Sequence, residues 1–151
     1  MQHAILSLIS VMASTLKGVE YLMTNGKKIL ISLIQILKDL SKQRAAAANP
    51  IANSVNTRFC IAIMQKMSIK SQLSPIFIEN NVIDFILDRL EDHYNSSKKN
   101  INPNTKQPEG MQHVFFLDFS TALLANILHS KITQDWLVKN DQQLISISNR
   151  L

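Results

Sequence analysis

The sequence predicts an all-α fold, a right-handed α-solenoid built of three-helix repeats, in one domain that spans residues 1–151. The chain has only 3 Gly and 4 Pro, too few turn residues for a sandwich or barrel of many short strands. Its apolar residues recur at the i, i+3, i+4, i+7 spacing of helices. A five-residue pattern also recurs three times, at intervals of about 55 to 60 residues, which is the signature of a repeat protein.

The composition supports a packed helical chain and limits the chemistry that it can carry. Apolar residues make up 46% of the chain and charged residues 18%, a balance that sustains a hydrophobic core. The single Cys excludes an intramolecular disulfide and a zinc site made of several cysteines, and it is compatible with a reducing compartment. The net charge of +5 indicates a weak general attraction to anionic surfaces.

Five stretches carry the helical pattern. Residues 28–40 and 82–93 each place their apolar side chains on one face, as an amphipathic helix does. Residues 4–16, 59–69 and 114–128 are apolar on almost every side. A helix of the second kind has to be covered on all sides, so we expect neighbouring helices to pack on both of its flanks.

Two segments have no apolar periodicity and are predicted to be loop insertions, at residues 43–56 and 95–110. The first contains four consecutive alanines and then Asn49-Pro50, which ends any helix that the alanines extend. The second is rich in Asn and Lys and contains two of the four prolines. We therefore expect the helical repeats to be interrupted at these two places.

The repeated pattern consists of an aromatic residue or Ile, two apolar residues, any residue, and Asn. It occurs at residues 21–25, 76–80 and 136–140. A long apolar stretch precedes each copy, and an amphipathic stretch follows it. Because the flanks of the copies match, we predict that Tyr21, Ile76 and Trp136 take equivalent places in one stack of helices.

Turn-forming residues lie where the short helices would begin and end. Asn25-Gly26 and Asn80-Asn81 can adopt the positive φ that ends a short helix. Ser74 is expected to be an N-cap that is followed by Pro75 in the first turn. Thr133 is the expected N-cap of the third short helix.

The repeating unit is thus a short helix, an amphipathic helix and a long buried helix. On this interpretation the chain begins with an isolated long helix at residues 3–16, continues with full repeats at 17–69 and 72–130, and starts a third at 133. It comprises two full repeats with partial repeats at both ends. Neither end has the polar outer face of a capping repeat, so we expect a piece of a longer solenoid, or a short form that binds a partner or a second copy at its open ends.

The three-helix unit resembles the armadillo repeat, with its helices H1, H2 and H3. Residues 58–69, 76–81, 85–92 and 118–127 together resemble the solenoid of the LisH-domain-containing armadillo-repeat proteins of basal bodies and cilia. The resemblance implies a non-catalytic cytoplasmic scaffold of the basal body, the cilium or the axonemal cytoskeleton. Its partners would be other proteins, such as tubulin or axonemal proteins. The LisH motif and the coiled coil of that family are not visible here.

The resemblance also implies where a partner would bind. In armadillo solenoids the H3 helices line a concave groove, and an Asn on H3 hydrogen-bonds the main chain of a bound peptide. The matching positions are Ser10, Gln65 and Asn126, of which only Asn126 is the typical residue. The chain lacks the Trp that nuclear-import adaptors have one turn earlier, which argues against recognition of nuclear localisation signals. The residues at those positions are Leu6, Ile61 and Ala122.

Other interpretations of the same residues stay open. The alternative function is a basic helical-repeat module that binds a microtubule or nucleic-acid surface, although nucleic acid is the less favoured partner and solvation explains the same charges. Asp84, Asp88 and Glu91 form a narrow acidic stripe on one helix. Trp136 is expected to be a wedge between repeats, or else a partner contact at an exposed end. Asn126 can equally be a surface residue without a ligand.

No residues predict catalysis, a cofactor or a metal site. Cys60 lies between apolar neighbours and is expected to be buried. The four His residues are scattered, and the three Gly residues form no phosphate-binding loop. Residues 4–16 are fewer than the about 20 that a transmembrane helix needs, so we expect no membrane span. No Lys or Arg precedes this stretch as in a signal peptide, so we do not expect a signal peptide either.

Overall fold

A computed structural model describes residues 1–43, 50–99 and 111–150, and the fold is helical throughout these ranges. The helices are α1 (Gln2–Ala13), α2 (Leu16–Met23), α3 (Gly26–Gln43), α4 (Pro50–Ser68), the short 3-10 helix η1 (Ser71–Leu73), α5 (Ser74–Glu79), α6 (Val82–Lys99), α7 (Met111–His129), α8 (Lys131–Lys139) and α9 (Asp141–Ser148). No strand occurs in this described part of the chain, which confirms the predicted all-α class.

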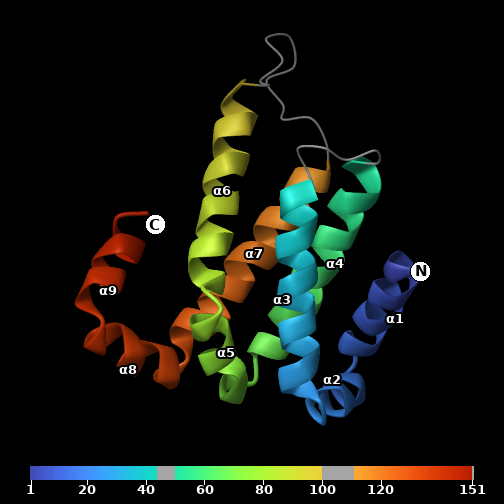
Figure 1. Ribbon diagram of the computed structural model, residues 1–151, viewed down its shortest axis with the longest axis horizontal. Helices are drawn as coiled ribbons and strands as arrows, with labels where there is room; N and C mark the ends of the chain where they lie inside the picture. The colour runs from blue at the N-terminus through green and yellow to red at the C-terminus, as the bar shows by residue number, and fades with distance from the viewer. Residues whose placement is uncertain (44–49, 100–110, 151) are drawn as a thin grey trace.

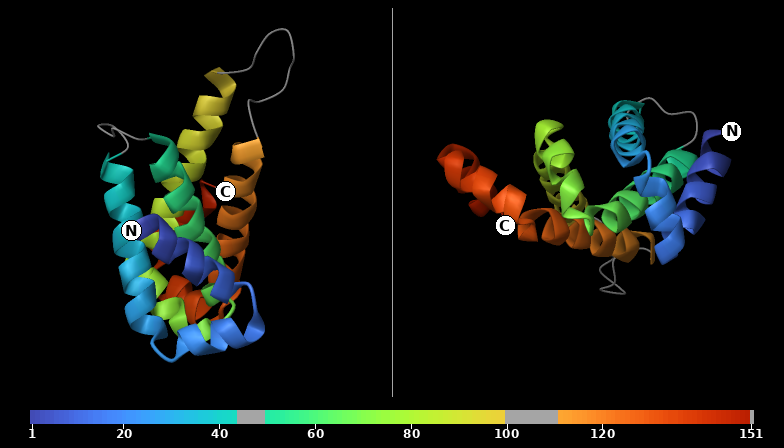
Figure 2. Two further views of the ribbon diagram at one scale, coloured as in Figure 1. Left: turned by 90° about the vertical axis from the view of Figure 1, so that its right-hand side faces the viewer. Right: turned by 90° about the horizontal axis from the view of Figure 1, so that it is seen from below.

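The long helices α1, α4 and α7 lie side by side and form one layer of the molecule (Figure 1). In the centre of this layer, α4 packs against α1 on one side and α7 on the other. The view from below in Figure 2 shows that α3 and α6 stand against the same face of the layer. The short helices α2, α5 and α8 each connect a long helix to the next helix along the chain, which is α3, α6 and α9 respectively, so the elements follow one another in the expected order.

Helix extends into both segments that were predicted to be loops. Because α4 begins at Pro50, the prediction of a loop over 43–56 was wrong for residues 50–56. Proline fits the first position of a helix, since its fixed φ is helical and its missing N–H would have no partner there. The end of α6 at Lys99 likewise makes residues 95–99 of the predicted loop at 95–110 helical. Residue 43 is the last residue of α3, so it is helical as well. Residues 44–49 and 100–110 of the two predicted loops lie outside the described ranges.

The three short helices end on the same kind of hydrogen bond. In each, a side chain donates to the main-chain carbonyl of the first residue of the repeated pattern. The bonds join Thr24 Oγ1 to Tyr21 at 2.7 Å, Asn80 Nδ2 to Ile76 at 2.8 Å, and Asn140 Nδ2 to Trp136 at 2.7 Å. The predicted positive φ occurs at Asn81, at 53°. It was wrong for Asn25-Gly26, because Thr24 closes α2 and Gly26 already begins α3.

Two residues predicted to be N-caps are not N-caps. Ser74 is the first residue of α5, because η1 runs directly into it and Leu73 takes the cap position. Pro75 lies in the first turn of α5 as predicted. The third short helix, α8, starts directly after its N-cap Ser130, so Thr133 lies inside this helix and is buried.

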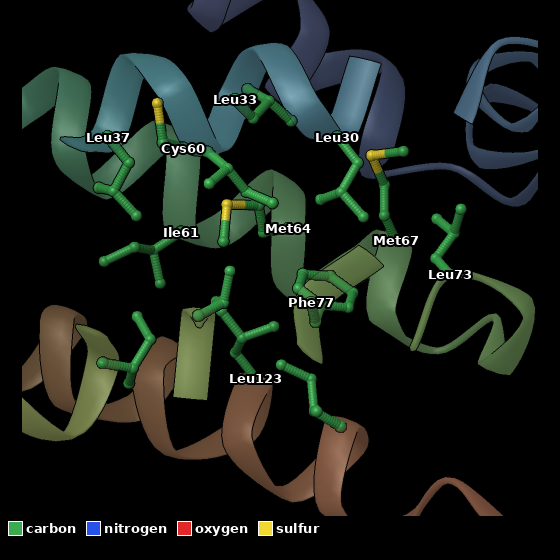
Figure 3. Packing of buried hydrophobic residues seen from close by; sticks show 14 of the residues in the cluster. Leu30, Leu33, Leu37, Cys60, Ile61, Met64, Met67, Leu73, Phe77 and Leu123 are labelled. Carbon is green, nitrogen blue, oxygen red and sulfur yellow. The ribbon is translucent and has the colours of Figure 1, made fainter. Parts of the chain in front are cut away.

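One hydrophobic core fills the space between the two layers (Figure 3). Its largest fully buried side chains come from the three long helices and from α3, α5 and α6. They include Leu6, Leu30, Leu33, Ile61, Met64, Met67, Phe77, Ile86 and Leu123. The face of α3 that faces α4 is thus the apolar face predicted for residues 28–40, and α6 buries the corresponding face of residues 82–93.

Candidate partner-binding surfaces

Ser10, Gln65 and Asn126, the predicted partner-binding residues of the long helices, occupy matching positions. Each lies three residues before the last residue of its helix, in α1, α4 and α7 respectively. Because these helices lie side by side, the residues form a row across the layer, which we call the polar row. All three are partly exposed.

The Asn126 side chain is engaged within the molecule. Its Nδ2 donates to the main-chain carbonyl of Gln65 at 3.2 Å and to Ser68 Oγ at 3.0 Å. Ser68 Oγ in turn donates to the same carbonyl at 2.7 Å. These bonds fasten the C-terminal ends of α4 and α7 to each other, so Asn126 has a structural role whether or not it binds a partner.

The Gln65 side chain is less fully satisfied. Its oxygen Oε1 is buried and has no hydrogen-bond partner among the described residues. An unpaired buried acceptor costs about 1–3 kcal/mol. The buried Oε1 is itself closed to a bound chain, so a partner could use only the part of the Gln65 side chain that stays exposed.

The positions one turn earlier belong to the core. Leu6 and Ile61 are each 1% exposed, and Ala122 is partly exposed. Leu6 and Ile61 are also members of the main hydrophobic cluster. Leu6 and Ile61 are thus closed to a partner, whereas Ala122 and the three residues of the polar row are partly exposed.

Trp136 lies in α8 and is partly buried. Its ring packs against the main hydrophobic cluster, and its carbonyl accepts the hydrogen bond from Asn140 that ends the helix. Its place between α8 and the core agrees with a packing role. A contact with a partner would use only the part of the ring that stays exposed.

Sequence reasoning missed an apolar groove between α1 and α3. The groove has a volume of about 510 Å³. Its apolar lining consists of Ile5, Leu6 and Ile9 from α1 and Ile29, Leu33 and Ile36 from α3. The exposed residues Lys28 and Ser32 also line it. The signal in the sequence was that residues 4–16 are apolar on almost every side, so that other helices are expected to pack around them. The sequence does not show which side of this helix stays uncovered.

Large apolar side chains are exposed at both ends of the row of helices, which lie on opposite sides of the molecule (Figure 2). We call the end at α1 and α2 the N-terminal edge, defined by Ile5, Leu8, Val11 and Tyr21. We call the end at α8 and α9 the C-terminal edge, defined by Ile132, Val138 and Ile145.

In the repeated pattern, too, the exposure of a residue depends on whether it lies at an edge. Its second residue is buried in all three copies, as Leu22, Phe77 and Leu137. Its first residue differs, because Tyr21 is 66% exposed, Ile76 is 6% exposed and Trp136 is partly exposed. The three first residues thus match in their place at the end of a short helix but not in their surroundings, since Tyr21 lies at the N-terminal edge.

The acidic stripe of α6 holds the end of the chain. Arg150 Nε donates to Glu91 Oε1 at 2.7 Å, its Nη2 donates to Asp88 Oδ1 at 2.6 Å, and its Nη1 lies 3.8 Å from Asp84 Oδ1. The hydrogen bond to Glu91, helped by Asp88, raises the pKa of Arg150 above its ordinary value. We call this arrangement the Arg150 clamp. Sequence reasoning found the stripe but not its partner.

Cys60 is completely buried in α4, as predicted. Burial raises the pKa of its thiol to about 12, so the thiol is protonated at neutral pH. In the ranges that the structure describes, no group of three His, Cys, Asp or Glu residues is arranged to hold a metal ion.

None of the described helices is by itself long and apolar enough to cross a membrane. Only α1 and α2 taken together reach that length and composition, and the two are bent by 116° relative to each other.

Comparison with models of known protein families, with curated proteins and with solved structures gives no match for this chain.

Proposed function

We propose that this chain is a non-catalytic scaffold of armadillo-type helical repeats, which binds other proteins along the layer formed by α1, α4 and α7. The observation that carries the proposal is the polar row. Ser10, Gln65 and Asn126 recur at one position in three helices that lie side by side. Hydroxyl and amide groups at such a regular spacing can pair with the N–H and C=O groups of a chain laid across the helices.

The order of the helices supports a solenoid of three-helix repeats, and the resemblance to armadillo proteins implies that it is right-handed. A short helix, a longer helix and a long buried helix follow one another twice, and α8 and α9 begin the series again. In a stack of this kind each unit contacts only its neighbours and adds to one continuous surface. The resemblance to armadillo proteins of basal bodies and cilia extends the proposal to a cytoplasmic ciliary or basal-body assembly, with tubulin or axonemal proteins as partners.

Gln65 is the residue of the row that best tests the proposal. Replacing Asn126 would also remove the bonds between α4 and α7, so a loss of binding could come from a loss of structure. Gln65→Ala removes an amide whose Oε1 has no partner among the described residues. The matched control is Gln35→Ala on α3, because this exposed amide only bonds Asp39 on its own helix.

The experiment is affinity capture from an extract of ciliated cells with the tagged chain as bait. We expect axonemal or centriolar proteins to be captured, Gln65→Ala to weaken their binding about 2- to 10-fold, and Gln35→Ala to bind as the parent does. Raising the salt concentration should change this binding little. A steep loss with salt would contradict the proposal and favour the basic surface instead. Capture that is the same for Gln65→Ala and the parent would exclude the polar row.

A further inference from the structure

The helix α9 is attached to the rest of the molecule by few side chains. Of its side chains that the structure describes, only Ile147 is buried, and this residue belongs to the main hydrophobic cluster. The others, Gln142, Ile145, Ser146 and Ser148, are exposed. The helix that α9 contacts most is α8, which precedes it in the chain. A segment with so few buried contacts opens locally at a lower free energy than the core does.

A second attachment lies one turn further along, at the Arg150 clamp. Beyond α9 the chain points toward α6 (Figure 1), and the main-chain N–H of Arg150 donates to the carbonyl of Ile147 at 3.1 Å. This turn fixes the two side chains relative to each other. Ile147 is 3% exposed and the Arg150 side chain is 22% exposed. The segment is therefore fastened by an aliphatic side chain and by a guanidinium three residues later.

The groups that receive Arg150 lie beside an apolar side chain of α6. The guanidinium meets Asp84, Asp88 and Glu91, as described above. Leu87 lies next to this stripe on the helix, because it follows Asp84 by three residues and precedes Glu91 by four. Leu87 is 3% exposed and belongs to the same hydrophobic cluster as Ile147. We call Leu87 and the three carboxylates the α6 site.

We propose that α9 is a displaceable cover of the α6 site, and that the site binds a partner segment in which a large aliphatic residue is followed three residues later by Arg. The segment that occupies the site in this structure shows this chemistry, because it presents Ile147 and Arg150 at that spacing. A partner segment with the same two side chains competes with α9. The contact is thus autoinhibitory, since the site is open only in the fraction of molecules in which α9 is detached.

The clamp is the part of this contact that salt weakens. Its three carboxylates are between 31% and 67% exposed, so solvent ions screen their attraction to Arg150. The lysines of α8 are placed differently: Lys131 pairs with Asp135 at 2.6 Å, and Lys139 lies before α9, at the end away from Arg150. Because salt does not screen the burial of apolar side chains, a rise in salt should loosen α9 and leave the core closed.

The first test is hydrogen exchange of the whole parent chain at about 0.05 M and about 1 M NaCl. The amides of α9 should exchange faster than those of α4 at both concentrations. Raising the salt should speed exchange in α9 about twofold to fivefold and leave α4 unchanged. This measurement needs no substitution. Exchange in α9 that is as slow as in α4, or that does not respond to salt, would overturn the proposal.

The second test is the binding of a labelled peptide with the sequence of residues 141–150 to the whole chain, followed by fluorescence anisotropy. The parent is compared with Ile147→Ala, which loosens α9. The matched control is Ile145→Ala, the same change at a residue of the same helix that is 59% exposed. Ile147→Ala should bind the peptide at least about fivefold more tightly than the other two chains do. A peptide with Arg150→Gln should bind about twofold to fivefold more weakly than the unchanged peptide.

Equal binding of the peptide to the three chains, or no binding to Ile147→Ala, would exclude the α6 site. Circular dichroism shows whether Ile147→Ala keeps its helices. A loss of helix throughout the chain would also contradict the proposal, because α9 would then not be a separable element. The inference concerns α6 and α9 and does not depend on the proposed function, since capture of partners through the polar row is measured independently.

Discussion

Truncation of Ile63 and of Leu8, two residues at one position of neighbouring long helices, should have very different costs. Ile63 in α4 is 0% exposed, and Leu8 in α1 is 62% exposed. Both substitutions to Ala remove the same number of carbon atoms from an apolar side chain in a helix. The difference in unfolding free energy between the two variants therefore measures how much burial by the helices around α4 contributes to stability at this position.

The expected magnitudes follow from burial. Ile63→Ala removes three buried carbons, worth about 2.4 kcal/mol in transfer free energy, and the cavity that it leaves raises the total to about 3–4 kcal/mol. Leu8→Ala removes carbons of a side chain that is less than half buried, which is worth about 1 kcal/mol, and the better helix propensity of Ala offsets a few tenths of this. We expect a difference of about 2–3 kcal/mol.

Urea denaturation, followed by circular dichroism at low protein concentration, measures both variants. The midpoint should fall strongly for Ile63→Ala and slightly for Leu8→Ala, with the same dependence of unfolding free energy on urea as in the parent. Leu124→Ala in α7 should resemble Ile63→Ala, because Leu124 is also buried. A cost for Leu8→Ala that equals the cost for Ile63→Ala would refute the correspondence between α1 and α4.

Three further predictions concern contacts that the structure defines. Arg150→Gln should lower stability by about 1 kcal/mol or less, since the clamp is partly solvated, and should speed hydrogen exchange in α9 while leaving α4 unchanged. Asn126→Ala should cost about 1–2 kcal/mol in urea denaturation, because Ser68 and the Gln65 carbonyl lose a donor. The Cys60 thiol should resist thiol reagents in the folded chain at pH 8. Between its ordinary pKa of 9.0 and about 12, only the unfolded thiol ionises, so stability should fall with rising pH by up to about 1.4 kcal/mol per unit, a loss that Cys60→Ala lacks.

The helices were predictable because their signals are local. The i, i+3, i+4, i+7 pattern of residues 28–40 depends on residues close in sequence, and α3 buries the face that it predicts. The ends of the helices were less predictable because several residues compete for each cap. Thr24 rather than Asn25-Gly26 closes α2, and Ser130 rather than Thr133 begins α8.

The candidate surfaces were predictable only in part. The positions of Ser10, Gln65 and Asn126 were predicted from the resemblance to armadillo repeats, and the three residues take matching places in their helices. The bonds of Asn126 to α4 could not, because its partners are far away in sequence and meet it only in the folded chain. The same reason hid Arg150, whose carboxylate partners lie on α6.

Burial in a stack of repeats is set by neighbouring helices as much as by residue type. This explains why residues at one position of the repeated pattern differ in how far they are buried. Tyr21, Ile76 and Trp136 hold one place in their short helices, and their carbonyls accept the same capping bond. Only Ile76, the middle copy, has a unit on each side, and only Ile76 is buried. In the repeat architecture proposed above, this difference is expected, because the stability of a repeat array is the sum of intrinsic terms and of contacts between neighbouring units.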